Sequence, residues 1–340
     1  SGVSATSYDT SKINAAYSKV VEYYKNNNNL NNADKILAVE SLGLEAESNQ
    51  FDTSSADLSS TSLSKKIVTE VLLGVDPTED KKTLESQIDE NGNVEGSWGA
   101  SSDVWTLYAL YVTSSEKTNL IANKSNDELA ASSVCGYEWG GTYYADYDTT
   151  GWVIEGLAVV NKEKYATTIN KAIDYIKNNT TMTTTGWVTA DNVDTQSQVL
   201  EGMFAYDTNA LLNDSYTVHP VDCLLNTQLS DGSFPSGYNA EYTTAEVAKT
   251  LGTYKNGSVI IKAKKAYDKM MNPEQPDNTK PAQPTDTKKD SQSTNKVETT
   301  NQKTTSVKTG DETNVVIFVS LSMVSGGLFL VLRKEYERVH

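Results

Sequence analysis

One class of segment recurs six times between residues 10 and 272. In each copy an apolar residue follows a residue that is usually small, inside a mostly apolar run. The copies are ADKILAVESLGL (33–44), KKIVTEVLLGV (65–75), DVWTLYALYV (103–112), DTTGWVIEGLAVV (148–160), DTQSQVLEGMFAY (194–206) and YTTAEVAKTLGTY (242–254). We call the aligned apolar residue of each copy its anchor residue; the six are Leu42, Leu73, Leu110, Leu157, Met203 and Leu251. The last four anchor residues lie 47, 46 and 48 residues apart, and the earlier gaps are 31 and 37. A repeat of this kind predicts supersecondary units that bury their core by stacking on one another.

The pattern of apolar residues predicts helices in two environments. The recurring segments are apolar on both faces, which indicates buried inner helices. Between them lie amphipathic stretches at 13–26, 165–179 and 258–271, whose polar faces carry Lys, Asp and Asn. These stretches are typical of an outer, solvated layer. We therefore expect an all-α domain over residues 10–272, preceded by a flexible N-terminus at 1–9.

A glycine and an aromatic residue come directly before several of the predicted inner helices. These turns are Gly96-Ser97-Trp98, Gly186-Trp187 and Gly232-Ser233-Phe234, and Gly140-Gly141 holds the corresponding place in its repeat. Glycine permits a sharp turn, and an aromatic ring can wedge between neighbouring repeats.

One of these turns carries a resemblance to a known superfamily. QLSDGSF at 228–234 resembles the Gln-x3-Gly-x-Trp/Phe repeat of the squalene cyclases and protein prenyltransferases, and LLGVDP at 72–77 looks like surface proteins that carry such repeats. The resemblance implies an (α/α)6 toroid of six inner and six outer helices. The intrinsic factor and transcobalamin corrinoid carriers share that toroid.

The C-terminal region has a different composition. Residues 273–305 are rich in Pro, Thr and Lys, and such a segment buries too little apolar surface to fold, so we expect a disordered stalk. Residues 315–332 form an uncharged run of 18, near the lower limit for one transmembrane helix. Arg333 and Lys334 follow at once, and a basic cluster marks the cytoplasmic side of a membrane.

Residues 306–340 resemble the cell-wall sorting signal of Gram-positive surface proteins. Thr309 and Gly310 stand where the Leu-Pro-x-Thr-Gly motif has them, whereas Ser306 and Val307 replace its Leu-Pro pair. The resemblance implies that a sortase cleaves between Thr309 and Gly310 and joins Thr309 to peptidoglycan on the outer surface. An ordinary single-pass membrane anchor is the alternative. Either requires export, so we expect a leader to have been removed before Ser1.

The charge balance argues against a nucleic-acid partner, and the small numbers of Cys and His limit metal and disulfide chemistry. The net charge of −16 argues against nucleic acid, which requires a basic surface. Two Cys are too few for a disulfide scaffold or a cysteine-only zinc site, and two His limit metal or acid–base chemistry that depends on His. His219 and Cys223 share a helical spacing, but Pro220 at the first helical turn places His219 at the N-cap. We predict neither a metal nor a cofactor, and leave open a disulfide between Cys135 and Cys223.

Three aspartates are the first candidates for acid chemistry. Asp146-Tyr147-Asp148-Thr149 resembles the cyclase acid motif Asp-x-Asp-Asp, with Thr149 in place of the last carboxyl. Asp194-Thr195 stands where Asp148-Thr149 does, one repeat later. Because a feature that recurs with the repeat is typical of helix capping, we interpret Asp148 and Asp194 as N-caps.

Two glutamates are the second candidates. Glu155 and Glu201 align in the repeat with Glu40, Tyr108 and Lys249. Carboxylates across a central cavity would suit a glycosidase as acid and base. Packing between inner helices is the reading that we favour for them.

Aromatic residues near the turns form the candidate binding site. The toroid would bring the turns to one pole, so we predict ligand binding by Trp98, Trp139, Tyr143, Tyr144, Tyr147, Tyr238 and Tyr242.

The sequence thus favours a non-catalytic, cell-wall-anchored binding protein. Its ligand would be a small molecule (a corrinoid-like one included), a glycan or a host partner. The alternatives are a glycan-cleaving or degenerate cyclase-type enzyme, using the acidic residues at the same pole, and a structural spacer or adhesin. Fold alone does not decide among them.

Overall fold

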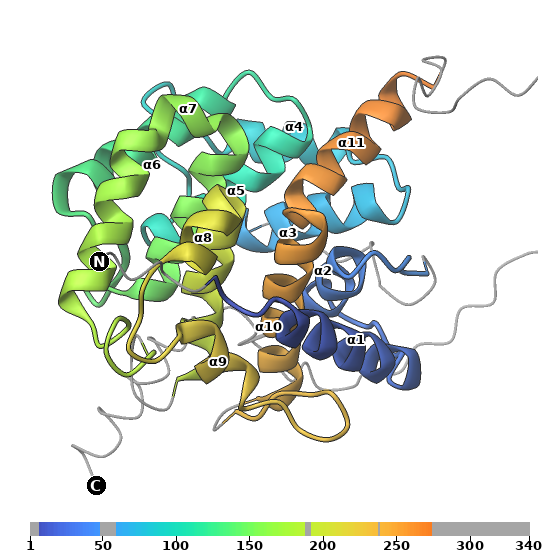
Figure 1. The fold of residues 1–340 in the computed structure, drawn as a ribbon. Helices are drawn as coiled ribbons and strands as arrows, with labels where there is room; N and C mark the ends of the chain where they lie inside the picture. The colour runs from blue at the N-terminus through green and yellow to red at the C-terminus, as the bar shows by residue number, and fades with distance from the viewer. Residues whose placement is uncertain (1–6, 48–58, 188–191, 237–238, 274–340) are drawn as a thin grey trace, which may run out of the picture. The chain divides into compact units, whose positions relative to one another are not determined.

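The computed structural model describes residues 7–47, 59–187, 192–236 and 239–273. These residues are helical except for one hairpin and the connecting loops (Figure 1). The elements are α1 (Ser11–Asn26), α2 (Ala33–Ser41), α3 (Ser60–Leu72), α4 (Thr78–Ser86), α5 (Ala100–Val112), α6 (Thr118–Ser132), β1 (Gly136–Trp139), β2 (Thr142–Ala145), α7 (Tyr147–Asn179), α8 (Val193–Asn213), α9 (Pro220–Leu225), α10 (Ala240–Asn256) and α11 (Val259–Met271). The prediction of an all-α domain is confirmed. The predicted stalk, membrane segment and sorting signal lie outside the described residues.

The six recurring segments fall in α2, α3, α5, α7, α8 and α10. Each of these helices contacts the next along the chain, and α10 contacts α2, so the order of contacts is cyclic. Within the recurring segments these helices are mostly buried, and in α5 every residue except Tyr111 is buried. Two of them continue past a bend, at Asn161 in α7 and Asp207 in α8, where the backbone leaves the helical region. Beyond the Asn161 bend lies the amphipathic stretch that we predicted at 165–179.

Glycines at helix contacts bring the backbones of neighbouring helices together. A Cβ atom on Gly151 of α7 would lie 2.5 Å from the carbonyl oxygen of Gln198 of α8. In the same way, a Cβ on Gly202 would collide with the carbonyl of Gly151, and one on Gly252 with that of Ser41 in α2. The contacts α7–α8 and α10–α2 therefore require glycine at these positions.

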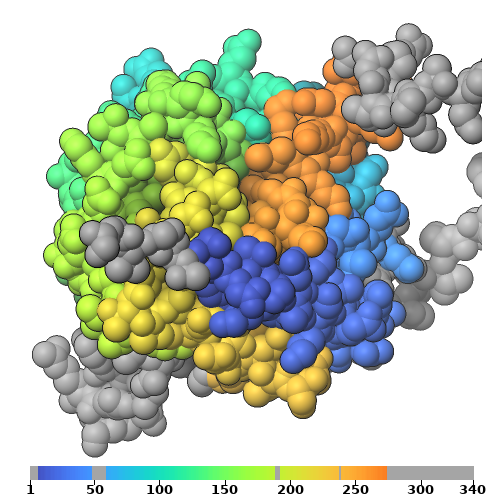
Figure 2. All heavy atoms as spheres, viewed as in Figure 1, coloured from blue at the N-terminus to red at the C-terminus, as the bar shows by residue number. Residues whose placement is uncertain are grey.

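The segment 228–234, which carries the superfamily resemblance, packs against α1 near the start of the chain. The Gln228 amide donates to the carbonyls of Ala16 in α1 (3.1 Å) and Gly232 (3.1 Å). Gly232 has φ +91° and packs against the backbone of Lys19, and the Phe234 ring is fully buried. Figures 1 and 2 show α1, in dark blue, beside the orange and yellow segments near the other end of the described chain.

Four helices of the cycle begin with a side-chain cap. Asn32, Asp146, Asn192 and Asn239 accept hydrogen bonds from backbone N–H groups in the first turns of α2, α7, α8 and α10. The prediction that Asp148 and Asp194 are the caps is wrong. Both lie inside the first turn, and the extended residue two positions earlier caps each helix.

The strands β1 and β2 form an antiparallel hairpin between α6 and α7. Gly140 and Gly141 make its turn with φ +57° and +79°, a conformation that favours glycine. The register pairs Tyr137 with Tyr144 and Trp139 with Thr142. The hairpin replaces what the sequence indicated only as a glycine-rich loop.

Two further points concern the described part of the chain. None of its helices has the length and hydropathy needed to cross a bilayer. Both cysteines carry free, buried thiols, so Cys135 and Cys223 do not form the disulfide that the sequence left open.

Candidate functional site

The first turns of α2, α7, α8 and α10 lie at one end of the helix cycle. Burial and the negative charges of Glu246, Asp34, Asp194 and Asp148 raise the pKa of the Tyr242 phenol well above its ordinary value. Such coupling requires first-turn carboxyl groups of three other helices to lie near Tyr242 in α10. We call this end the helix-start end.

Three candidate acids lie together at the helix-start end. Burial is the largest cause that raises the pKa of Asp146 and of Asp194, each to about 6. The pKa of Asp148 is raised well above its ordinary value by burial and by the charge of Asp146. The structure thus brings together the three aspartates that the sequence singled out, and burial disfavours the charged form of each of them.

The second group of acids lies deeper in the cycle, and an ion pair holds part of it. Lys249 contacts Glu246 at 3.0 Å, and both side chains are buried. Burial lowers the pKa of Lys249, but the charges of Glu246, Glu201 and Glu155 outweigh it and raise the value overall. Burial also raises the pKa of Glu155 and of Glu201, with the charge of Glu155 adding to the second.

Hydrogen bonds from neighbouring helices complete this deeper group. The Tyr108 hydroxyl donates to the backbone oxygen of Trp152 (2.9 Å), and the Ser258 hydroxyl donates to Glu155 (2.7 Å). Glu40, which aligns with Glu155 in the repeat, is not part of the group. It instead binds Lys262 of α11 at 2.5 Å and accepts from the backbone of Ala46.

A third set of contacts lies between the two groups of acids and was missed by sequence reasoning. Lys65 of α3 binds Asp34 of α2 at 3.2 Å, and its ammonium lies 4.5 Å from the centre of the Trp105 ring. Lys249 lies 5.6 Å from the same ring. Cation–π contacts of this kind hold charges inside an apolar layer. The sequence feature that could have indicated this pair was the presence of Lys65 and Asp34 inside mostly apolar recurring segments.

The hairpin carries the most exposed candidate aromatics. Trp139 is 48% exposed and Tyr143 is 46% exposed. The pairing places Trp139 and Tyr144 on one face and Tyr143 on the other. Tyr144 stacks on Tyr137 at 5.5 Å, and the Tyr143 hydroxyl donates to Glu128 of α6 (3.1 Å). Two large rings are therefore presented to solvent by a hairpin that α6 steadies.

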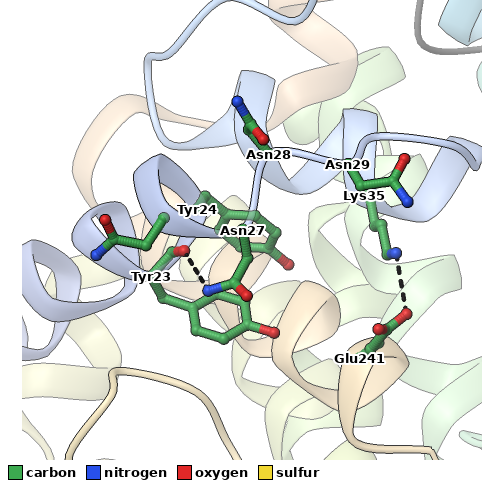
Figure 3. A pocket seen from close by; sticks show the side chains of 8 residues that line it. Tyr23, Tyr24, Asn27, Asn28, Asn29, Lys35 and Glu241 are labelled. Atoms are coloured by element: carbon green, nitrogen blue, oxygen red, sulfur yellow. Dashed lines mark hydrogen bonds and ion pairs between the residues drawn. The ribbon is translucent and has the colours of Figure 1, made fainter.

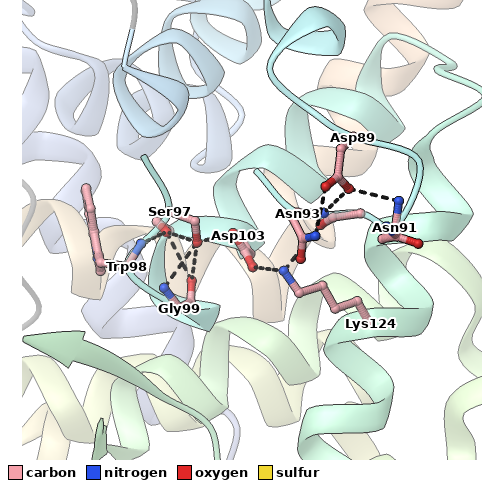
Figure 4. A network of polar contacts seen from close by, with 10 residues as sticks. Asp89, Asn91, Asn93, Ser97, Trp98, Gly99, Asp103 and Lys124 are labelled. Atoms are coloured by element: carbon pink, nitrogen blue, oxygen red, sulfur yellow. Dashed lines mark hydrogen bonds and ion pairs between the residues drawn. The ribbon is translucent and has the colours of Figure 1, made fainter. Parts of the chain in front are cut away.

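The turn at Trp98 supports the hairpin. The Trp98 carbonyl accepts the backbone N–H of Glu138 at 2.6 Å, which links the turn to β1. Figure 4 shows the polar network beside this turn: Ser97 donates to Asp103 at 2.5 Å, and Asp103 binds Lys124 at 3.2 Å. These bonds fix the conformation of the turn, so Trp98 is held in place but only partly buried.

The remaining aromatic candidates lie apart from the two exposed rings. Tyr147 is the first residue of α7 and is partly buried. Tyr242 lies in α10, in a different sector of the cycle, and Tyr238 falls outside the described residues. Of the seven predicted residues, the hairpin therefore carries Trp139, Tyr143 and Tyr144, and a backbone hydrogen bond ties it to the turn at Trp98.

His219 and Cys223, which the sequence raised as possible metal ligands, each form a hydrogen bond with the backbone. His219 is the N-cap of α9, as predicted, and its Nδ1 atom accepts from the backbone of Val221 (3.2 Å). The Cys223 thiol donates to the carbonyl of Thr185 (3.2 Å). In the parts of the chain that the structure describes, no three His, Cys, Asp or Glu side chains are grouped as metal ligands.

No protein-family model, no curated protein and no solved structure matches the chain.

Proposed function

We propose that residues 10–272 form a closed (α/α)6 toroid. The cyclic order of contacts from α2 to α10 and back to α2 supports it. The motif at 228–234 supports it as well, because Gln228 and Gly232 hold the second half of the chain against α1. The amphipathic helix α1 precedes the first buried helix, and α4, α6 and α9 lie between later ones along the chain, as an outer layer requires.

On this scaffold we propose a non-catalytic binding protein whose contact surface is the hairpin β1–β2. The observation that carries the proposal is the exposure of Trp139 and Tyr143 on one short hairpin. Large aromatic side chains that remain in water on a steadied loop are typical of recognition surfaces. Rings on opposite faces of a hairpin fit an extended partner, a glycan chain or a protein, better than a small molecule that must be enclosed.

We further propose that the protein is displayed on the outer surface of a Gram-positive cell. The sequence of 306–340 supports this by its resemblance to a sorting signal, with sortase and peptidoglycan as processing partners. Residues 273–305 would then separate the toroid from the wall.

Binding of the full chain to glycan arrays and to host-cell surfaces tests the hairpin directly. Replacing Trp139 and Tyr143 with Ala removes the two exposed rings, and we expect binding to fall at least about tenfold, as for the loss of interface anchors. Leu229→Ala is the matched control, because Leu229 is 47% exposed on a different loop. Binding that survives the double substitution, or that Leu229→Ala reduces equally, would contradict the proposal.

A second candidate function is acid catalysis at the helix-start end. The observation that favours it is the buried group of Asp146, Asp148 and Asp194, in which burial and the charge of Asp146 raise the pKa of Asp148 well above its ordinary value. A protonated carboxyl in a water-poor site is a suitable general acid. Asp148→Asn keeps the shape and removes the acidic proton, so turnover of a substrate found in extracts would be lost while hairpin binding stays unchanged.

A further inference from the structure

A pocket of about 250 Å³ lies where the first repeat meets the last (Figure 3). Its walls come from the end of α1, the loop after it and the starts of α2 and α10. The lining residues are Tyr23, Tyr24, Asn26, Asn27, Asn28, Asn29, Lys35 and Glu241. In the helix cycle this is the α10–α2 boundary, whereas the hairpin leads into α7. The pocket is thus a separate site from the proposed contact surface.

Tyr24 gives the pocket an unused polar group. Its side chain is only 4% exposed, and its hydroxyl has no hydrogen-bond partner among the described residues. A buried hydroxyl without a partner costs free energy, and a ligand hydroxyl would relieve that cost. Figure 3 shows the hydroxyls of Tyr23 and Tyr24 on the side of their rings that faces Lys35 and Glu241.

The charges at the pocket cancel. Lys35 binds Glu241 at 2.9 Å, and the Lys35 side chain is mostly buried whereas that of Glu241 is mostly exposed. A site with one paired cation and anion offers donors and acceptors but no net charge. It therefore favours a neutral ligand over a phosphate or an amine.

The rest of the lining matches a ligand with many hydroxyl groups. Each asparagine amide carries both a donor and an acceptor, and four of them, Asn26 to Asn29, line the pocket. Asn27 donates to the carbonyl of Tyr23 at 2.9 Å, which orients its amide. The Tyr23 ring adds an apolar wall. The volume lies below the range of about 300–1,000 Å³ for drug-sized ligands, so the occupant is small.

We propose that this pocket binds one pyranose residue of a neutral sugar. The hydroxyls of the ring would bond to the Tyr24 phenol and the asparagine amides, and one face of the ring would lie against Tyr23. This site is independent of the hairpin, so it holds whether or not the hairpin contacts a partner.

The test uses the full 340-residue chain in a detergent without a sugar headgroup. Saturation-transfer NMR and titration would measure binding of the methyl pyranosides of glucose, galactose, mannose and N-acetylglucosamine, with inorganic phosphate as the charged comparison. We expect at least one glycoside to bind and phosphate not to compete. A trisaccharide ending in the same residue distinguishes a glycan end, which would bind as well or better, from a free sugar, which alone would bind.

Tyr24→Phe is the decisive variant. It removes only the hydroxyl, which has no protein partner, so the fold stays intact. We expect affinity for the glycoside to fall about three- to tenfold, the value of one hydrogen bond. Tyr254→Phe, on α10 away from the pocket, should leave the affinity unchanged. The proposal is overturned if no glycoside binds at millimolar concentration, if phosphate competes, or if Tyr24→Phe binds as tightly as the original chain.

Discussion

Buried charges at the centre of the helix cycle depend on a single cation for much of their balance. Lys249 binds Glu246 and lies near Glu155 and Glu201, whose pKa values burial already raises. A buried charge that loses its partner is far costlier than an exposed one. Sequence alignment of the repeats placed Lys249 beside the two glutamates, but it could not show the Lys65–Asp34 pair, because pairing across helices depends on their rotation about the axis.

Replacing Lys249 with Met should therefore destabilise the protein strongly. Loss of the partner of a buried carboxylate costs about 3–5 kcal/mol. The effect should be smaller at pH 5 than at pH 8, since Glu155 and Glu201, whose pKa values are raised, need no cation once they are protonated. Urea unfolding at the two pH values measures it, and Lys82→Met, on the exposed face of α4, should leave the midpoint unchanged. An equal loss at both pH values would contradict the electrostatic explanation.

The buried aspartates predict an unusual dependence of stability on pH. The folded-state pKa values of Asp146 and Asp194 are raised from 3.8 to about 6, and that of Glu70 from 4.5 to about 8. Groups raised in this way bind protons more tightly in the folded state, so their stabilisation is complete below pH 4 and is lost as the pH rises through 6 to 8. Each aspartate accounts for up to about 3 kcal/mol.

Denaturant unfolding at pH 4.5, 6 and 8 should thus show stability that falls with pH. Carboxyls with a lowered pKa, such as Asp76 and Asp231, work in the opposite sense, but only near and below pH 4. Asp194→Asn should flatten the slope between pH 4.5 and 6, since amide and acid have similar shape. Stability that instead rises over this window would show that the aspartates are hydrated in solution.

At the scale of elements, glycines decide how closely the helices approach. Gly202 faces the backbone of Gly151, whereas Gly156 faces only the side chains of Leu107, Tyr108 and Val104, at 3.2–3.4 Å. Both glycines precede the anchor residue of their repeat, so the sequence makes them look equivalent. The two sites differ because each faces a different neighbour.

Alanine at these two positions should therefore have unequal effects. Gly202→Ala forces two backbones apart, and overpacking of this kind costs about 1–3 kcal/mol or more. Gly156→Ala needs only a small side-chain movement and adds helix propensity, so its effect should be near zero. Thermal unfolding of the two variants gives the comparison. Equal losses would mean that the α7–α8 contact is looser than described.

The elements that the sequence predicted best were the buried helices, because their apolar pattern follows directly from burial on all sides. All six recurring segments proved to be helical. The hairpin β1–β2 was missed, because four-residue strands around Gly140-Gly141 give no period long enough to read. The N-caps were predicted two residues late, since the recurring Asp-Thr pair drew attention away from Asp146 and Asn192.

At the scale of the whole molecule, closure of the helix cycle joins residues that are distant in sequence. The motif at 228–234 was the sequence feature that pointed to closure, and the structure shows why: Gln228 reaches the backbone of α1. The pocket beside Lys35 and Glu241 exists only because α10 returns to α2. Sequence reasoning did not single out its four asparagines, and no pattern predicted which residues from the other end would line it.

Gln228→Ala tests closure at this scale. It leaves the carbonyls of Ala16 and Gly232 without their shared donor, at a cost of about 1–3 kcal/mol. We call the contact between α1 and the 228–234 turn the seam. The rate of hydrogen exchange should increase more in α1 and in this turn than in α5, which lies away from the seam. Uniform quickening across all the helices would argue that the seam is not a separate unit.

Hydrogen–deuterium exchange of the full chain, free and with the partner found by array or cell binding, tests the central claim most directly. The claim is that the hairpin β1–β2 is the contact surface, so we expect new protection at residues 136–145 and at the turn around Trp98. Occupation of the pyranose pocket alone would instead protect residues 23–35 and the start of α10. A bound partner that leaves residues 136–145 unprotected would contradict the account.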